Sequence, residues 1–129
     1  MRIEHVAIWT QDLQAVRDFY CTWFQAEAGP GYANEAKGFE SCFLTFPSGA
    51  RLELMRSDVK LKQPLKPEDT PAGYAHIAFS AGSEVRVDIL TKQLQEAGYT
   101  VLDGPRRTGD GYYESVVLDP DGNRVEITV

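Results

Sequence analysis

An imperfect internal repeat constrains the fold of this chain more than any other feature. The segment FLTFPSGARLELM (43–55) matches VVLDPDGNRVEIT (116–128), with proline, glycine, arginine and glutamate at the same places. A second pair of segments, 3–20 and 74–90, matches through a shared histidine. Two copies of a unit this long indicate a duplicated supersecondary unit rather than an array of short repeats.

Each copy predicts one helix and several strands in the same order. The helices show helical spacing of apolar residues and begin after a capping residue, Asp12 or Ser83. Turn-forming residues join the last two strands of each copy into a hairpin. Segment 29–38 is a loop with room for a short strand, and 104–111 is a glycine-rich loop. The predicted strands are 2–10, 39–46, 50–56, 74–80, 99–103, 112–118 and 123–128, and the predicted helices are 12–25 and 84–97.

These elements predict an α+β fold built from two βαβββ-like units. The units span approximately residues 1–57 and 73–129, and the polar, proline-containing stretch 58–72 is predicted to link them. The length of the chain, 1–129, suits one domain or two very small halves that share a core.

Composition narrows the classes of partner. The net charge of −6 argues against nucleic acid or an anionic membrane as the main partner. The N-terminus lacks an apolar signal region, and no apolar run approaches the ~18 residues of a membrane span, so a cytoplasmic protein is expected. Cys21 and Cys42 have no metal-binding or disulfide-like spacing and are predicted to be reduced thiols.

Strand alternation places four residues of metal-binding type on the same side of their strands. In each strand that carries one, the neighbouring residues on the other side are mostly aliphatic and suit packing beneath a helix. A sheet with one solvated face shows the same alternation, so each residue alone has a second interpretation as a solvated side chain. The chain has only two histidines, however, and both occupy the same place in the repeat. We therefore predict one divalent metal site with the ligands His5, Glu53, His76 and Glu126.

The chemistry of this set suits a catalytic metal. Two imidazoles and two carboxylates are donors for Zn²⁺, Ni²⁺, Co²⁺, Mn²⁺ or Fe²⁺. The two carboxylates cancel the charge of the ion, which lowers the cost of burying it. The set contains no cysteine, which argues against a structural zinc site.

The same residues resemble the vicinal oxygen chelate superfamily, and within it glyoxalase I (lactoylglutathione lyase). The resemblance covers essentially the whole chain through IEHVAIWTQDLQAVRDFY, GYAHIAFS and VVLDPDGNRVEIT. It implies paired βαβββ modules that form a metal-binding cup, with zinc or nickel as the expected metal. The glyoxalase I ligand pattern, His or Gln, Glu, His, Glu, maps onto the four residues named above.

The resemblance also implies a reaction and an assembly. A metal that chelates two vicinal oxygens acidifies the intervening C–H, as in a 2-oxoaldehyde thiol adduct. Glu126 is then the expected base and Glu53 its partner in proton transfer, which makes the protein a lyase or isomerase. The expected assembly is a homodimer with sites at its interface, although the two modules of one chain offer an alternative way to close the cup.

Residues expected to contact substrate include departures from glyoxalase I. Trp9 stands where that enzyme has an arginine, and Arg56-Ser57 stands near the place of an asparagine, which puts glutathione itself in question. Arg106 and Arg107 lie in the predicted loop 104–111, where the resemblance implies a lid that meets an anionic group. The full set predicted to contact substrate is Trp9, Met55, Arg56, Arg106, Arg107 and Tyr113.

Two other function classes remain open at this stage. One is a different metalloenzyme of the superfamily, such as a dioxygenase, an epimerase or a thiol transferase. The other is a non-catalytic protein that binds a small molecule. Glu53 favours the glyoxalase-like interpretation, because the dioxygenases and thiol transferases use two histidines and one glutamate.

Overall fold

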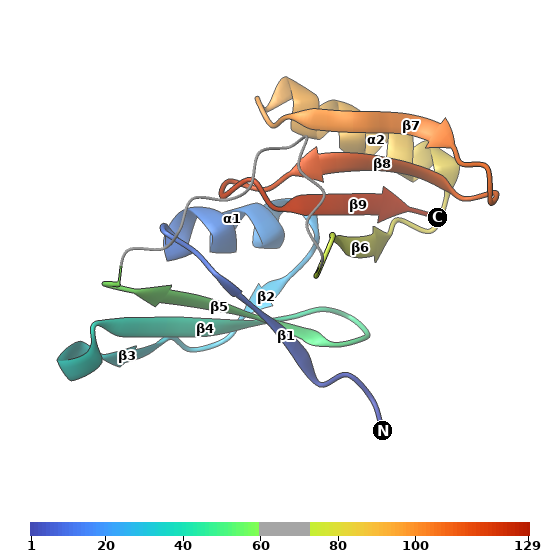
Figure 1. Cartoon of the computed structure of the whole chain (residues 1–129). Helices are drawn as coiled ribbons and strands as arrows, with labels where there is room; N and C mark the ends of the chain where they lie inside the picture. Colours follow the sequence, from blue (N-terminus) through green and yellow to red (C-terminus); the bar gives the residue numbers. More distant parts are fainter. Residues whose placement is uncertain (60–72) are drawn as a thin grey trace. The chain divides into compact units, whose positions relative to one another are not determined.

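The computed structural model describes residues 1–59 and 73–129. The chain divides into two compact units, Met1–Gln63 (unit 1) and Pro64–Val129 (unit 2). Most of the predicted linker 58–72 lies outside the described residues. Among the described residues each unit has one α-helix and one mixed sheet, so the predicted α+β fold with two βαβββ-like modules is confirmed (Figure 1).

In unit 1 the sheet has the strand order β1-β5-β4-β2, with β3 also paired to β4. The edge strand β1 runs parallel to β5, and the other pairs are antiparallel. Helix α1 covers one face of this sheet (Figure 1). The elements are β1 (His5–Trp9), α1 (Leu13–Trp23), β2 (Glu27–Ala28), β3 (Tyr32–Asn34), the 3-10 helix η1 (Glu35–Lys37), β4 (Phe39–Thr45) and β5 (Arg51–Ser57).

The core of unit 1 lies between α1 and the aliphatic face of the sheet. Strand β5 alternates between buried leucines and partly exposed residues, as the sequence pattern predicts. Asp12 caps the helix, because its carboxylate accepts a hydrogen bond of 3.0 Å from the backbone N–H of Ala15. The buried residues of this core include Val16, Phe19, Tyr20, Cys42, Leu44, Leu52 and Leu54.

Unit 2 repeats the arrangement with the strand order β6-β9-β8-β7. Strand β6 is parallel to β9, and the helix α2 covers one face (Figure 1). Ser83 caps α2, as predicted, by accepting a hydrogen bond from the backbone N–H of Arg86. The elements are β6 (Ile77–Ser80), α2 (Glu84–Glu96), β7 (Val101–Arg107), β8 (Tyr113–Leu118) and β9 (Arg124–Thr128), and the buried core includes Val87, Thr91, Leu94, Val117, Val125 and Ile127.

The prediction of a loop over residues 104–111 is wrong for its first half, which belongs to a strand. Strand β7 continues to Arg107 and stays paired with β8 through two shifts of register. Gly104 has φ +77°, and a Cβ there would lie 2.5 Å from the carbonyl oxygen of Glu114, so glycine allows this close approach. Pro105 is tolerated because β7 is an edge strand, where one missing N–H breaks no continuous ladder.

Two further features agree with the sequence. Segment 29–38 does contain a short strand, β3, followed by η1. Both cysteines are free; Cys42 is buried, and this burial raises the pKa of its thiol. Neither described helix combines the length and the apolar character that crossing a membrane requires.

Two neighbouring residues of β5 test the assignment of the sheet faces. Leu54 is fully buried beneath α1, whereas Met55 lies on the opposite, partly exposed face. We expect Leu54→Ala to lower the free energy of unfolding by about 3 kcal/mol, because it leaves a cavity. Met55→Ala should cost less than about 1 kcal/mol. Urea unfolding monitored by circular dichroism gives both values, and equal losses would contradict the assignment.

Candidate metal-binding site

Strand pairing places a histidine and a glutamate side by side in each unit. Glu53 on β5 pairs with Ala7 on the parallel strand β1, and Glu126 on β9 pairs with Ala78 on β6. The histidine lies two residues before the alanine in both cases; His5 is the first residue of β1, and His76 directly precedes β6. Alanine has a small side chain, so the space beside each glutamate stays open to the imidazole.

The two pairs have similar geometry. His5 Nε2 lies 3.8 Å from Glu53 Oε2, and His76 Nε2 lies 3.2 Å from Glu126 Oε2. The side chains of the histidines are 40% and 42% exposed, and those of the glutamates are 17% and 15% exposed. The repeat seen in the sequence is therefore also a repeat of side-chain environment.

The separation of 3.2 Å in unit 2 equals that of two ligands of one metal ion, and the separation of 3.8 Å in unit 1 is slightly longer. With metal–ligand bonds of about 2.1 Å, two ligands at 90° lie about 3.0 Å apart, and two tetrahedral ligands about 3.4 Å apart. Each pair therefore offers a nitrogen and an oxygen donor at nearly the spacing that an ion requires. Within residues 1–59 and 73–129, three or more histidine, cysteine or acidic groups do not come together as a metal-binding cluster. Each unit by itself thus supplies two donors of the predicted four.

The carboxylate of Glu4, which was not predicted as part of the site, contacts the ring nitrogen of His5 that faces away from Glu53. Glu4 Oε2 lies 2.5 Å from His5 Nδ1, and Glu4 Oε1 accepts hydrogen bonds from Arg51 Nε at 2.9 Å and from Nη2 at 2.5 Å. The hydrogen bond with His5, followed by the pairing with Arg51, lowers the pKa of Glu4. The ring of Phe43 meets His5 edge to face at 5.4 Å and lies 4.0 Å from the guanidinium carbon of Arg51.

In unit 2 a second acidic residue, Glu114, shares the face that carries His76 and Glu126. Glu114 lies on β8, paired with Thr128 of β9 and with Arg106 of β7. Burial is the main cause that raises the pKa of Glu114, and the negative charge of Glu126 adds to it. The charge of Arg106 opposes this shift. Glu114 was not among the residues predicted from the sequence; it lies two residues before Val116, the partner of Glu126, and so shares the face of Glu126.

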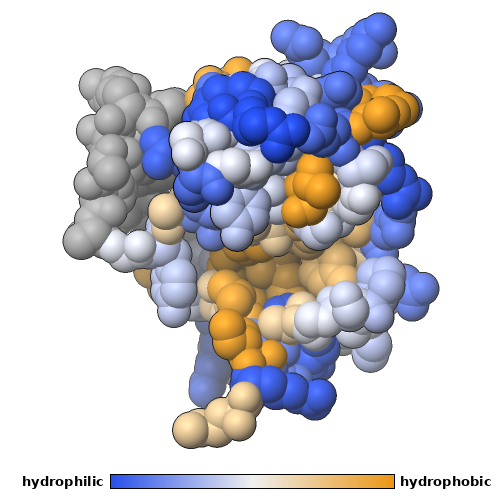
Figure 2. All heavy atoms as spheres, turned by 90° about the vertical axis from the view of Figure 1, so that its right-hand side faces the viewer, coloured by the Kyte–Doolittle hydropathy of each residue, from blue (hydrophilic) through white to orange (hydrophobic). Residues whose placement is uncertain are grey.

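Three of the predicted substrate contacts share a face with a predicted ligand. Trp9 and Met55 are paired partners on the face of His5 and Glu53, and Arg106 is on the face of Glu126. Trp9 is 49% exposed and meets Phe39 edge to face at 6.2 Å, and Phe39 also contacts Tyr32. This half of the site is therefore bordered by aromatic side chains. Figure 2 shows that hydrophobic residues reach the surface on one side of the molecule, among hydrophilic ones.

The other three lie on the opposite, helix-covered faces. Arg56 forms an ion pair with Glu40 at 3.1 Å, and both line a shallow pocket at the start of α1. The hydroxyl of Tyr113 donates to Asp88 of α2 at 2.7 Å, and Arg107 pairs with Glu84 of the same helix. The structure therefore does not bring these side chains to the predicted ligands of their own unit.

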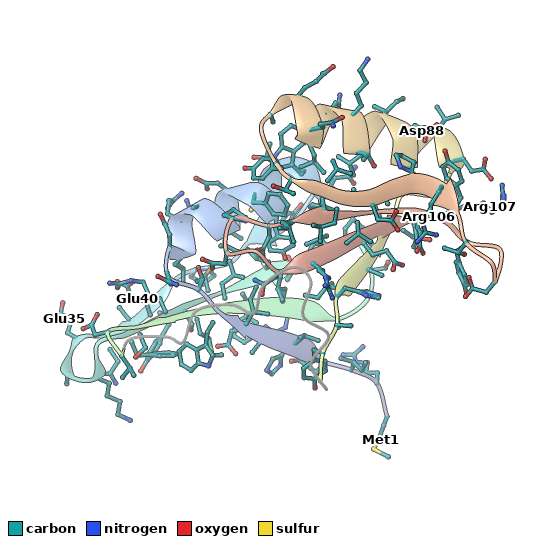
Figure 3. The ribbon with its side chains drawn as sticks, turned by 45° about the horizontal axis from the view of Figure 1, so that its top comes forward. Met1, Glu35, Glu40, Asp88, Arg106 and Arg107 are labelled. Carbon is teal, nitrogen blue, oxygen red and sulfur yellow. The ribbon has the colours of Figure 1, made fainter. Side chains whose placement is uncertain are left out.

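The segment predicted to form a lid includes the end of a strand. Arg106 and Arg107 both belong to β7 and lie near its end, beside the turn to β8 (Figure 3). Arg106 Nε donates to Asp103 Oδ2 at 2.8 Å, and this ion pair lowers the pKa of Asp103. Since both arginines are held in a paired strand, the prediction that they sit on a loop is wrong.

Comparison with known proteins assigns the family. The family model described as the glyoxalase/bleomycin resistance protein/dioxygenase superfamily matches residues 2–127. The chain belongs to this superfamily. The resemblance noted from the sequence is thereby confirmed at the level of the glyoxalase superfamily.

Proteins of similar sequence or structure include the uncharacterized protein YqjT of Bacillus subtilis. It is 33% identical over 97% of this chain and 96% of its own length. A glyoxalase family protein from Enterococcus faecalis has a TM-score of 0.78 and 26% identity, covering 98% of this chain and 96% of that one. Glyoxalase I from Zea mays has a TM-score of 0.80 and 20% identity, covering 98% of this chain and 44% of that one. The maize enzyme supports the fold alone.

Glu114 gives a pH-dependent test of the unit 2 face. Because its pKa is raised in the folded chain, its protonated form favours folding, and that contribution is lost as the pH rises through the folded-state pKa. Glutamine imitates the protonated form. Glu114→Gln should therefore stabilise the metal-free protein at pH 7 by roughly 0.5 kcal/mol, or about 2 °C in Tm.

At a pH below the unfolded-state pKa of about 4.3 the difference should disappear, because Glu114 is then protonated in both states. Thermal unfolding with a chelator present, at both pH values, measures the effect. The same gain at low pH would show that charge is not its cause.

Proposed function

We propose that this protein is a divalent-metal-dependent, glyoxalase-like lyase or isomerase. One ion would be held by His5, Glu53, His76 and Glu126, with zinc or nickel as the most suitable metals. The observation that carries the proposal is the duplicated His–Glu pair, with the same strand register and the same exposure in both units. Membership of the glyoxalase superfamily supports it, since this donor set matches the ligands of glyoxalase I.

The proposed reaction moves a proton between adjacent carbons of the substrate. When bound, the ion supplies a Lewis acid that polarises two neighbouring oxygens of the substrate. Glu126 takes a proton from one carbon and returns it to the next, which restores the carboxylate. Glu53 is its partner on the other side, and His5 and His76 stay in place as neutral nitrogen donors. Both glutamates are largely shielded from water, which suits proton transfer to carbon.

The surroundings of His5 bear on the substrate. Trp9 and Met55 border the His5–Glu53 pair, and Phe39 and Tyr32 extend this aromatic surface. A tryptophan replaces the positive charge that glyoxalase I uses for the carboxylate of glutathione. We therefore propose a small-molecule substrate with vicinal oxygens, such as a 2-oxoaldehyde thiol adduct, whose thiol need not be glutathione.

Metal content and turnover test this function directly. The purified protein should contain one divalent ion per site, and after reconstitution with Zn²⁺, Ni²⁺ or Co²⁺ it should convert a 2-oxoaldehyde thiol adduct. The hemithioacetal of methylglyoxal and glutathione is the first substrate to use, followed by adducts of other thiols. Glu53→Gln should weaken metal binding by more than about 100-fold, which exceeds the roughly 10–100-fold effect of residues that only orient a ligand.

Glu40→Gln is the matched control. Glu40 lies on the same sheet but on the other face, where it pairs with Arg56 (Figure 3). It should leave metal affinity unchanged. A chain that binds metal but converts no thiol adduct, and consumes oxygen with a catechol, would be a dioxygenase instead. A folded chain that binds no metal would contradict the proposal itself.

Assembly gives a separate prediction. Each unit supplies one His–Glu pair, and we propose a homodimer in which two chains complete two shared sites. Sedimentation analysis should then give a dimer of the 14.4 kDa chain. A monomer that still binds one ion per chain would instead show that the two units of one chain complete the site.

A further inference from the structure

We propose that Glu4 is a positioning residue for His5, which fixes the tautomer and the orientation of the imidazole and so preorganises one half of the metal site. This inference rests on the proposed function, in which His5 is a metal ligand. It goes beyond that function by assigning a role to a residue outside the predicted ligand set. It also makes the two halves of the site unequal.

The two nitrogens of the His5 ring face two different carboxylates. Nδ1 lies 2.5 Å from Glu4 Oε2, whereas Nε2 lies 3.8 Å from Glu53 Oε2. An ionised carboxylate only accepts hydrogen bonds, so the contact with Glu4 requires the proton on Nδ1. In the neutral ring the lone pair is then on Nε2, directed to the side of Glu53. This is the tautomer that a ligand through Nε2 needs.

Glu4 is itself restrained by Arg51. Arg51 donates from Nε and Nη2 to Glu4 Oε1, which leaves Oε2 for the imidazole. The backbones of the same two residues are joined, because the N–H of Arg51 donates to the carbonyl oxygen of Glu4 at 2.9 Å. The guanidinium also lies over the ring of Phe43, which contacts His5 edge to face. These contacts connect β1, β4 and β5 around one ring and limit its rotation.

The repeat provides an internal comparison. The residue before the histidine of unit 2 is Ala75, which has no side chain that can accept a hydrogen bond from His76. Arg51 has a counterpart in Arg124, so the carboxylate at the position of Glu4 is one difference between the repeats, and the ring of Phe43, which Val116 replaces, is another. We therefore assign firm anchoring of the ion to His5 and Glu53. This leaves Glu126, the proposed base, in the half that has no counterpart of Glu4.

Two variants of Glu4 and one control test the inference. Glu4→Ala removes the acceptor, and Glu4→Gln keeps an acceptor but removes the charge. Glu40→Ala is the matched control, since it also removes a partly exposed glutamate that pairs with an arginine on the same sheet. Circular dichroism first establishes that all three variants fold.

The first readout needs no metal. In the metal-free wild type at a pH where the ring is neutral, ¹⁵N shifts of the His5 ring should report the Nδ1–H tautomer. In Glu4→Ala they should report a mixture of tautomers, as free imidazole does. The second readout is the Kd for Zn²⁺, from competition with a chromophoric chelator. Glu4→Ala should raise it about 10–100-fold and Glu4→Gln by less, whereas Glu40→Ala should leave it unchanged.

An unchanged tautomer in Glu4→Ala, or an unchanged Kd, would overturn the positioning role while leaving the metal site intact. A wild-type protein that binds no Zn²⁺ would overturn the proposed function, and with it the role of Glu4 toward a metal. The two failures are distinguishable, because the first arises in the comparison of variants and the second in the wild type alone.

Discussion

The parallel pairing of the first and last strands of each unit is the constraint on which the candidate site depends. In unit 1 it sets Ala7 opposite Glu53, and in unit 2 it sets Ala78 opposite Glu126. A shift by one residue would turn each glutamate to the helix side and place a buried leucine or valine in its stead. The cores beneath α1 and α2 therefore fix the register, and the register fixes the donors.

Much of this arrangement was predictable, because it depends on two periodic signals. The 73-residue spacing of the two hairpins revealed the duplication, and alternation along the strands separated the aliphatic face from the face of the four predicted ligands. Alternation also places Arg56, which directly follows Met55, on the other side of β5. The structure has Arg56 on that other side, where it pairs with Glu40.

Other features depend on contacts that no periodic pattern encodes. The face of Tyr113 follows from the pairing of β8 with β9, and the faces of Arg106 and Arg107 follow from register shifts in β7, which break simple alternation. Glu4 precedes a strand and is exposed, so it has no pattern of its own. Its role depends on the reach of Arg51, 47 residues later. A side-chain network of this kind can be recognised only once the structure is known.

The irregular path of β7 has a consequence for the protein in a concentrated solution. This strand is one of the two edges of the unit 2 sheet, and such edges invite hydrogen bonding with strands of other molecules. Pro105 lacks an N–H to donate, and the register shifts around it disturb the even row of backbone groups that an incoming strand would need. The glycine and proline that made the second half of this strand read as a loop thereby also help to keep the folded protein from aggregating.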